Sequence, residues 1–597
     1  MTAPFGRVGV IRSGEFLRIL ALPRRQLDLP SDGQDLLTEH LRTPNGTQRL
    51  RPIQTAALAE AYAQAPRNQG IVGAIGVGHG KFLITALAPT LLQELGKARR
   101  PLLFVPAKLK KQTLSEMEKA SKHWRVREDI KVLSYESLSV VSHAAFLDEY
   151  QPDLVMADEA QAFARLGSAR TRRFLRYFRT RDDIIFMPLS GTITKKSVKD
   201  YSHLVAAALR EMAPVPRTYV EVEQWSAALD EGVRDEFRIG AGALTEFCTD
   251  AELLEGLNGI RKGVRRRYTD TPGFVATSEA ALGSSLVIKA RMIPVPEVVR
   301  QAIHRLRTEY VLPNGDEVDS GISAWAAARQ LATGFAYQWD PAAPEEWLQA
   351  RKAWYRRVRE SIAHPPRGLR FDSPLEVARA AARGELPNTE EYERWVEVRG
   401  TFTPNPVPLW LSDYLVKDAE QWALNTGGVV WVEHSAAYRG VTGASGDDDL
   451  GAGFTKIPYF GAGKAGEAIM DYKGPCAASI RAHGTGRNLT QWTRGLIMNL
   501  PSSGASIEQL LARFHRPRPD GTEPDEVEFE FYCHTREMYE AFCNGRRGAE
   551  YIESSTNMAQ KLCYATILDH DGGAFSDERY TALIETGAPE WQKNGES

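Results

Sequence analysis

The sequence has few cysteines and no long apolar run. Its five cysteines are scattered along 597 residues without a CxxC pair, which argues against a disulfide framework and against a zinc site. No stretch reaches the ~18 apolar residues needed to cross a bilayer, and residues 1–15 contain no apolar signal segment. These absences predict a protein of a reducing cytoplasm that has no membrane partner.

Net charge is also nearly absent, since 74 Lys and Arg are balanced by 76 Asp and Glu to give −2. Global charge therefore neither supports nor excludes nucleic-acid binding, which would have to come from local clusters of basic residues. The hydrophobic content of 43% is ordinary. A chain of this length is too long for a single core, so we expect roughly three or four domains.

Two stretches of the chain alternate short β-rich runs with helical runs. Such alternation is typical of a parallel sheet covered by helices, so the predicted fold class is α/β, with two parallel-sheet lobes and a helical insertion between them. The expected strands are 70–75, 101–105, 131–133, 153–157 and 183–190 in the first lobe, and 429–432, 476–482, 495–499 and 527–532 in the second.

The same patterns divide the chain into five parts. We expect an N-terminal extension (1–46), a first lobe (47–210), a mostly helical insertion (211–417), a second lobe (418–550) and a C-terminal extension (551–597).

A glycine-rich loop, GVGHGK, lies at residues 76–81, directly after the first expected strand. Loops of this kind wrap phosphate oxygens with backbone N–H groups, while the lysine reaches the terminal phosphates. Phe82 stands where such loops normally carry a Ser or Thr that ligates Mg²⁺, so ATP binding is expected but hydrolysis stays open. The residues expected to bind the nucleotide here are Gly76, Gly78, His79, Gly80, Lys81 and Phe82.

Asp158 and Glu159 end the apolar run at 154–157. A buried strand of this kind points its terminal carboxylates at the phosphates. We expect Asp158 to hold Mg²⁺, partly through water, and Glu159 to orient or deprotonate the attacking water, so ATP and Mg²⁺ are the expected cofactors. The alternatives are a tight turn for the loop and a chance acidic pair at a helix start; the correct order of the two motifs weighs against both.

Together these motifs resemble those of superfamily 2 helicases and ATPases, most of all Swi/Snf-like translocases and phage-encoded DEAD/DEAH-type helicases. The resemblance covers roughly residues 47–205 and 425–535. It implies that the two lobes are RecA-like and bind ATP in the cleft between them, with Lys81 and Glu159 catalytic. Arg51 and Gln54, in the segment RPIQ, resemble the motif that reads adenine.

The second lobe carries two further resemblances. Thr485 and Gly486 lie in a segment similar to motif V, and residues 509–516, QLLARFHR, follow the spacing of motif VI, with Gln509 at its start. The resemblance implies that Gly486 and Gln509 bind the nucleotide. On a helix, Arg513 and Arg516 would share a face. The resemblance implies that they are arginine fingers for the γ-phosphate; two solvated surface arginines are the alternative.

Several residues are expected to contact nucleic acid. Pro106 and Lys108 resemble motif Ia, Ser190 and Thr192 resemble motif III, and Thr485 is a further contact implied by motif V. Between residues 161 and 181 there are seven arginines and no acid, with Arg172 and Arg176 on one helical face. This face could follow a phosphate backbone, or it could be a solvated surface over aromatic core residues.

The resemblance implies an ATP-dependent nucleic-acid motor, either a helicase or a translocase on double-stranded DNA. The implied partner is DNA, with duplex favoured and single strand allowed, together with replication, repair or defence proteins; a monomer is favoured. The implied location is the cytosol of a bacterium or of a phage-infected host. The alternatives are an ATP- and DNA-binding clamp with weak hydrolysis, because of Phe82, and an ATP-consuming subunit of a restriction or defence assembly.

Overall fold

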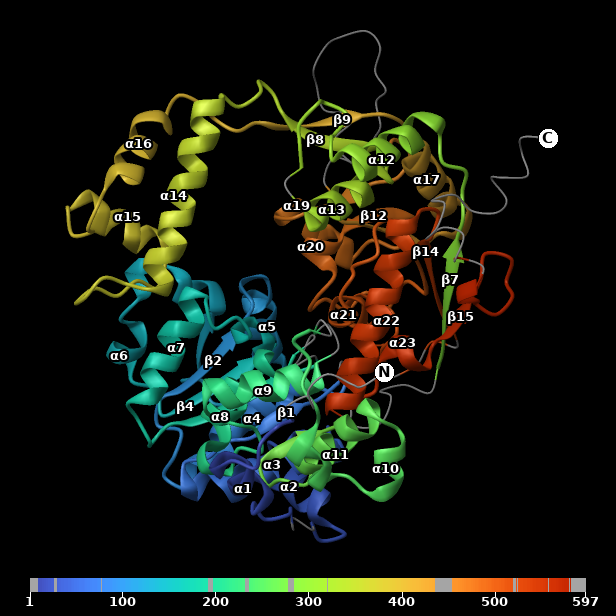
Figure 1. Cartoon of the computed structure of the whole chain (residues 1–597). Coiled ribbons are helices and arrows are strands. Elements are labelled where there is room, and N and C mark those ends of the chain that lie inside the picture. The colour runs from blue at the N-terminus through green and yellow to red at the C-terminus, as the bar shows by residue number, and fades with distance from the viewer. Residues whose placement is uncertain are drawn as a thin grey trace, which may run out of the picture. The chain divides into compact units, whose positions relative to one another are not determined.

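The computed structural model describes residues 9–25, 29–76, 78–191, 197–230, 233, 236–277, 284–318, 320–434, 454–518, 522, 524, 526–556, 558–578 and 580. The chain forms two compact units. The first contains residues 1–281, 358–387 and 550–560, and the second contains residues 282–357, 388–549 and 561–597. Figure 1 labels their helices and strands.

The first unit is built on a six-stranded parallel sheet with the order β3-β2-β4-β5-β1-β6. All five strands expected for the first lobe are present. The sixth, β6, lies in residues expected to belong to the helical insertion, and it pairs with β1. The strands are β1 Val72–Ala74, β2 Pro101–Val105, β3 Lys131–Ser134, β4 Leu154–Asp158, β5 Ile185–Ser190 and β6 Phe274–Ala276.

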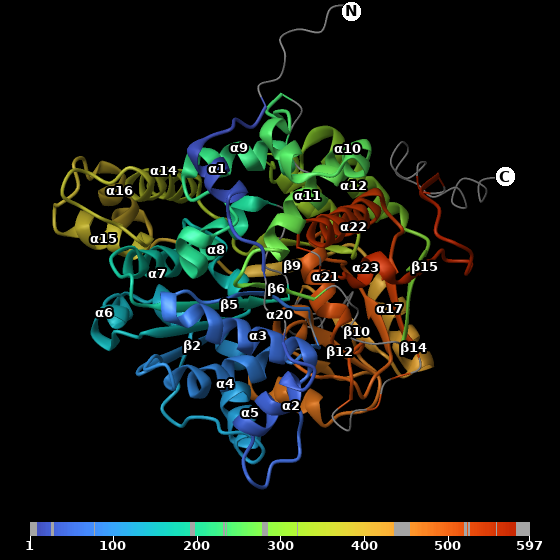
Figure 2. The ribbon, with the colours of Figure 1, turned by 90° about the horizontal axis from the view of Figure 1, so that it is seen from below.

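Helices cover both faces of this sheet. Successive strand residues point to opposite faces, so Val155 and Ala157 of β4 join one apolar cluster and Leu154 and Met156 join another. Figure 2 shows α3, α4 and α5 on one face and α7 and α8 on the other. The helices of this unit are α1 Gly14–Leu20, α2 Gly33–Leu41, α3 Pro52–Gln64, α4 Lys81–Gln93, α5 Lys110–Ser121, α6 Phe146–Tyr150, α7 Ala169–Arg179, α8 Ser202–Leu209, α9 Tyr219–Leu229, α10 Asp250–Leu254, α11 Leu257–Thr269 and α15 Pro374–Ala382.

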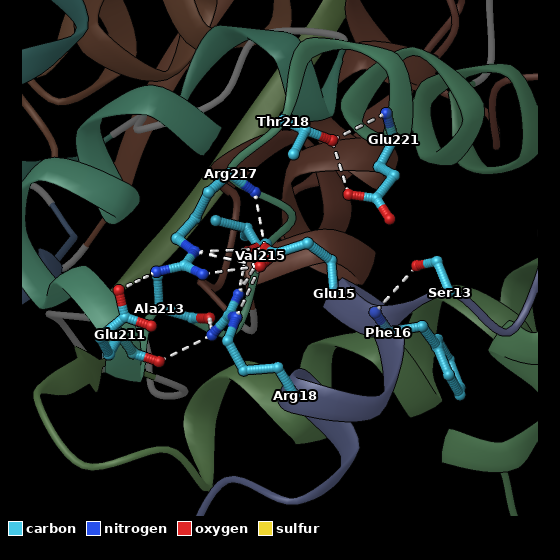
Figure 3. A network of polar contacts seen from close by, with 10 residues as sticks. All are labelled: Ser13, Glu15, Phe16, Arg18, Glu211, Ala213, Val215, Arg217, Thr218 and Glu221. Carbon is cyan, nitrogen blue, oxygen red and sulfur yellow. Dashed lines mark hydrogen bonds and ion pairs between the residues drawn. The ribbon is translucent and has the colours of Figure 1, made fainter.

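The N-terminal helix α1 is held to this unit by a polar network around Glu15 (Figure 3). The Glu15 carboxylate accepts hydrogen bonds from Arg217 Nη2 at 2.7 Å and from Arg18 Nη2 at 2.9 Å. Arg18 Nη1 also donates to the carbonyl oxygens of Glu211 and Ala213 at 2.7 and 2.8 Å. Burial raises the pKa of Glu15, but the hydrogen bonds from Arg217 and Arg18 outweigh it and lower that pKa to about 2.

The second unit is built on a seven-stranded parallel sheet with the order β11-β12-β10-β13-β14-β7-β15. The four expected strands are β10, β12, β13 and β14, although β12 ends earlier than expected because Ser479 caps a helix that starts at Ile480. The strands are β7 Ser285–Arg291, β10 Val429–Val432, β11 Tyr459–Phe460, β12 Cys476–Ser479, β13 Arg494–Ile497, β14 Glu526–Tyr532 and β15 Thr566–Leu568.

A small antiparallel sheet of β8 Phe335–Trp339 and β9 Pro406–Trp410 accompanies the large sheet of the second unit. The helices of this unit are α12 Glu297–Glu309, α13 Gly321–Leu331, α16 Glu390–Val398, α17 Tyr414–Thr426, α19 Lys464–Glu467, α20 Ile480–His483, α21 Gly504–Leu511 and α23 Lys561–Tyr564. Helices α14 Glu345–Ala363 and α22 Arg536–Thr556 contain residues of both units.

The two parallel sheets confirm the predicted α/β fold class with two parallel-sheet lobes. Within the described residues, no helix is both long enough and apolar enough to span a membrane.

Candidate active site

The glycine-rich loop leaves β1 and leads into α4, which begins at Lys81. Gly78 and Gly80 have φ angles of 95° and 73°, in the left-handed region that favours glycine. A Cβ on Gly80 would lie 2.4 Å from Gln54 Nε2, so any larger residue would displace the Gln54 amide group. No side chain caps the start of α4. The first N–H groups of the helix therefore suit an anion, as a phosphate loop requires.

Lys81 is buried at the base of the loop, with 8% of its surface exposed. Its Nζ donates hydrogen bonds to the carbonyl oxygens of Ile75 at 3.0 Å and Gly76 at 3.2 Å. These bonds hold the ammonium group inside the loop, where it is placed to reach phosphate oxygens. The His79 ring lies beside Gly76, since a Cβ on Gly76 would be 3.2 Å from His79 Cδ2.

Arg51 and Gln54 hold the outer side of the loop. Arg51 Nη1 donates to the Gly78 carbonyl at 2.6 Å, and Gln54 Nε2 donates to the Gly80 carbonyl at 3.0 Å. Gln54 Oε1 accepts from the backbone N–H of Arg51 at 2.8 Å and so caps α3. Both polar groups of Gln54 are thus used within the protein, and adenine reading by Gln54 stays a prediction.

Thr277 is a part of this site that the sequence did not reveal. It follows β6, is 6% exposed, and its Oγ1 accepts a hydrogen bond from the Gly76 N–H at 2.9 Å. It reaches the loop because β6 lies next to β1 in the sheet. The glycine-rich loop is therefore held from two sides, by the start of α3 and by the residue that follows β6.

Asp158 ends β4, and Glu159 follows in a left-handed conformation with φ 58°. The Glu159 N–H donates to Asp158 Oδ1 at 3.1 Å, and Tyr135 Oη donates to the Asp158 carbonyl at 2.6 Å. Burial and the neighbouring charge of Glu159 raise the pKa of Asp158 to about 7, while Lys81 acts in the opposite direction. A buried carboxylate of this kind fits a divalent cation, which would offset the cost of its charge.

Ser190 and Gln161 link the acidic pair to the phosphate loop. Gln161 Nε2 donates to Glu159 Oε2 at 2.7 Å, and Ser190 Oγ donates to Gln161 Oε1 at 2.5 Å. The Ser190 carbonyl accepts from the N–H of Ile75 at 3.1 Å. This chain of bonds is possible because β5 lies between β4 and β1, so that the ends of the three strands meet at one edge. Thr192 lies outside the described residues.

Phe82 lies in the first turn of α4, where its ring packs against the apolar cluster that contains Leu58 and Ile84. It offers no oxygen to a metal ion. Within the described residues there is also no cluster of three or more His, Cys, Asp or Glu side chains suited to a metal ion. Asp158 therefore fits Mg²⁺ only together with phosphate oxygens and water.

Four of the residues expected to contact nucleic acid lie at two other places of the first unit. Pro106 and the exposed Lys108 follow β2, in a turn where the Ala107 N–H donates to Glu136 Oε2 at 3.0 Å. On α7, Arg172 Nη1 donates to the Phe371 carbonyl at 3.0 Å, and Arg176 pairs with Asp372. Phosphate binding by these two arginines would have to replace the contacts with 371–372.

In the second unit, α21 ends at Leu511, so Arg513 and Arg516 lie in the turns that follow it. The expectation that they share a helical face is therefore wrong. Their guanidinium groups nevertheless converge, because Arg513 Nη1 and Arg516 Nη1 both donate to the Arg487 carbonyl, at 2.7 and 3.2 Å. Arg513 Nε also donates to the Gln509 carbonyl at 2.7 Å.

The segment that resembles motif V contributes polar groups beside these arginines. Gly486 has a φ of 81°, which places the turn before Arg487. Thr485 Oγ1 and Asn488 Oδ1 are buried and have no hydrogen-bond partner among the described residues. Buried polar atoms of this kind are costly unless a ligand or water satisfies them, which suits a polar binding site in this part of the second unit.

No family model matches this chain, and no curated protein matches it. Among solved structures, the Sulfolobus solfataricus SWI2/SNF2 ATPase core in complex with dsDNA is similar, with a TM-score of 0.30 and 13% sequence identity; the match covers 86% of this chain and 95% of that chain. A function therefore has to be argued from this chain's own residues.

Proposed function

We propose that this protein is an ATP-dependent nucleic-acid motor whose first unit supplies the phosphate-binding loop and the catalytic carboxylate. The observation that carries the proposal is the hydrogen-bonded chain from Ser190 through Gln161 to Glu159, next to the phosphate loop. These bonds fix the orientation of the Glu159 carboxylate and connect it to Ser190 at the end of β5. The Ser190 carbonyl in turn accepts a hydrogen bond from the Ile75 N–H, directly before the loop. A carboxylate positioned in this way suits the activation of water beside a bound triphosphate.

Each residue has a role in this proposal. The backbone N–H groups at the start of α4 bind phosphate oxygens, and the buried ammonium of Lys81 exchanges its carbonyl partners for them. Asp158 holds Mg²⁺, which supplies positive charge to the phosphates when bound. Glu159 orients the attacking water and accepts its proton. Arg513 and Arg516 of the second unit supply positive charge to the γ-phosphate.

Nucleic acid is the proposed partner because the motifs of both units resemble those of nucleic-acid motors. Lys108 is exposed after β2, where its positive charge is accessible to a strand. Duplex DNA is favoured by the Swi/Snf-like spacing of residues 509–516. Alternating ATP binding and hydrolysis would then move the protein along the nucleic acid.

The second candidate function is an ATP- and DNA-binding clamp that hydrolyses ATP slowly. Phe82 favours it, because the ring packs into the apolar cluster and leaves Mg²⁺ without the hydroxyl ligand that such loops normally supply.

An ATPase assay with no nucleic acid, with single-stranded DNA, with duplex DNA and with RNA tests both candidates. We expect turnover stimulated by duplex DNA, and Glu159→Gln should bind ATP but lower the rate by two orders of magnitude or more, roughly the scale of such charge effects. Glu149→Gln, an exposed acid on α6, is the matched control and should leave the rate unchanged. An unchanged rate in Glu159→Gln contradicts the motor, and ATP binding without stimulated turnover supports the clamp.

A further inference from the structure

Arg351, on α14, has its guanidinium group surrounded by aromatic rings instead of acids. Its Cζ lies 5.6 Å from the ring centre of Trp339, 5.2 Å from that of Trp347 and 5.4 Å from that of Tyr355. In the part of the chain that the structure describes, no hydrogen bond or ion pair is found for this group. Contacts with ring faces hold the planar cation in place but leave the N–H donors at its edge available.

Arg351 lines a groove of ≈ 1070 Å³ in the second unit, formed by the turn at 314–317, the end of β8 and the first half of α14. Lys352 and Tyr355 of the same helix line it as well. Lys352 is exposed, and Tyr355 keeps 49% of its surface accessible. Two cations therefore line the groove together with an aromatic side chain that is half exposed.

The acids of the groove are already partly satisfied. Asp316 accepts a hydrogen bond from Asn314 Nδ2 at 2.7 Å, and Glu345 accepts one from Gln349 Nε2 at 2.9 Å. Glu317 also lines the groove. Glu345 precedes Arg351 by six residues, which is ~9 Å along a helix at 1.5 Å per residue. Glu345 and Arg351 therefore line different parts of the groove along α14.

We propose that this groove binds one nucleotide unit, with its phosphate on Arg351 and Lys352 and its base stacked on Tyr355. The guanidinium edge matches two phosphate oxygens, and the rings already fix its orientation, so little side-chain freedom is lost on binding. Stacking of a base on an exposed aromatic ring is a main source of affinity for unpaired strands.

The nucleotide unit can be part of a single-stranded nucleic acid or a free nucleotide. Binding of a single strand rests on the proposed function, because that function makes the protein a nucleic-acid-binding protein. A fluorescein-labelled oligodeoxycytidylate is the probe for the strand, and unlabelled deoxycytidine monophosphate is the competitor for the free source. Binding is measured by fluorescence anisotropy on the full chain at several salt concentrations.

We expect Arg351→Ala to weaken oligonucleotide binding about tenfold and to flatten the dependence of log affinity on log salt by about 0.7. Tyr355→Ala should weaken binding about tenfold through lost stacking, and Tyr355→Phe should restore it. Arg356→Ala, which removes an exposed arginine of the same helix outside the groove, should bind nearly as the natural protein does. Displacement of the strand by the free monophosphate would identify the free nucleotide as the ligand.

Because Arg351 packs against aromatic rings, its loss could disturb the fold, so the exposed Lys352 gives a second variant. Lys352→Ala should weaken binding about threefold with an unchanged thermal midpoint. If all three alanine variants, at positions 351, 352 and 355, bind the oligonucleotide and the monophosphate as the natural protein does, the inference is overturned. Failure of the motor would instead leave these binding losses in place while ATP turnover is absent.

Discussion

We propose that Phe82 limits the rate of ATP hydrolysis. The test is to replace Phe82 with Thr and, in parallel, with Val, which has the same shape as Thr but no hydroxyl. Both changes remove the ring from the apolar cluster around Leu58 and Ile84. Truncating a fully buried Phe costs about 3–5 kcal/mol, and Phe82 is only partly buried, so we expect each variant to lose about 1–2 kcal/mol of stability. Only Thr adds a hydroxyl near the start of α4, where Mg²⁺ would lie beside Asp158.

The assay compares single-turnover ATP hydrolysis and thermal midpoints of the two variants at saturating Mg²⁺. Equal midpoints would show that the packing loss is matched. We expect Phe82→Thr to hydrolyse ATP about tenfold faster than Phe82→Val, because a direct metal ligand holds Mg²⁺ in near-ideal geometry. Equal rates in Thr and Val, or a natural protein as fast as Phe82→Thr, would refute the reasoning that the missing hydroxyl limits hydrolysis.

Three further predictions test other parts of the molecule. Arg516→Ala should lower the rate of ATP hydrolysis by about two to three orders of magnitude with little change in ATP affinity, whereas Arg494→Ala, an exposed arginine of β13, should leave the rate unchanged. Arg172→Ala combined with Arg176→Ala should flatten the salt dependence of duplex binding by about one to two units; an unchanged slope assigns α7 to packing against 371–372 alone. Glu15→Gln should lower stability by about 1–2 kcal/mol at pH 7 after screening. Since the folded pKa of Glu15, about 2, is below its ordinary 4.5, this difference should be fully present above pH 4.5 and vanish as the pH falls towards 2; a difference that is constant with pH contradicts the role of this carboxylate.

The sequence predicted the parts of the site that depend on local signals. The strand before the acidic pair is a continuous apolar run, which is typical of a central parallel strand, and it is observed as β4 ending at Asp158. The glycine loop was recognisable because its glycines and lysine are adjacent in the chain. A short motif of this kind can be recognised from adjacent residues alone, and it also predicts the strand before it and the helix after it.

Other features depend on contacts between distant residues and left no local signal. Strand β6 is only three residues long and pairs with β1, some two hundred positions earlier in the chain. Strand β7, SLVIKAR, includes charged residues and lies among helical patterns, so it was not recognised. The end of α21 at Leu511 was not predicted, because the spacing of residues 509–516 suits a longer helix. In the structure the chain leaves the helix at Ala512.

Thr277 shows why such distant contacts matter for function. Its Oγ1 accepts from the Gly76 N–H, so that N–H is not available to a phosphate, and the anion contacts have to come from the N–H groups nearer α4. The chain continues from Thr277 to Ser285, the first residue of β7 in the second unit. A movement of Gly76 when phosphate binds would act on Thr277 through this hydrogen bond. The glycine-rich loop is therefore hydrogen-bonded to the last described residue of the first unit before the chain reaches β7, a contact that pairing of β6 with β1 makes possible.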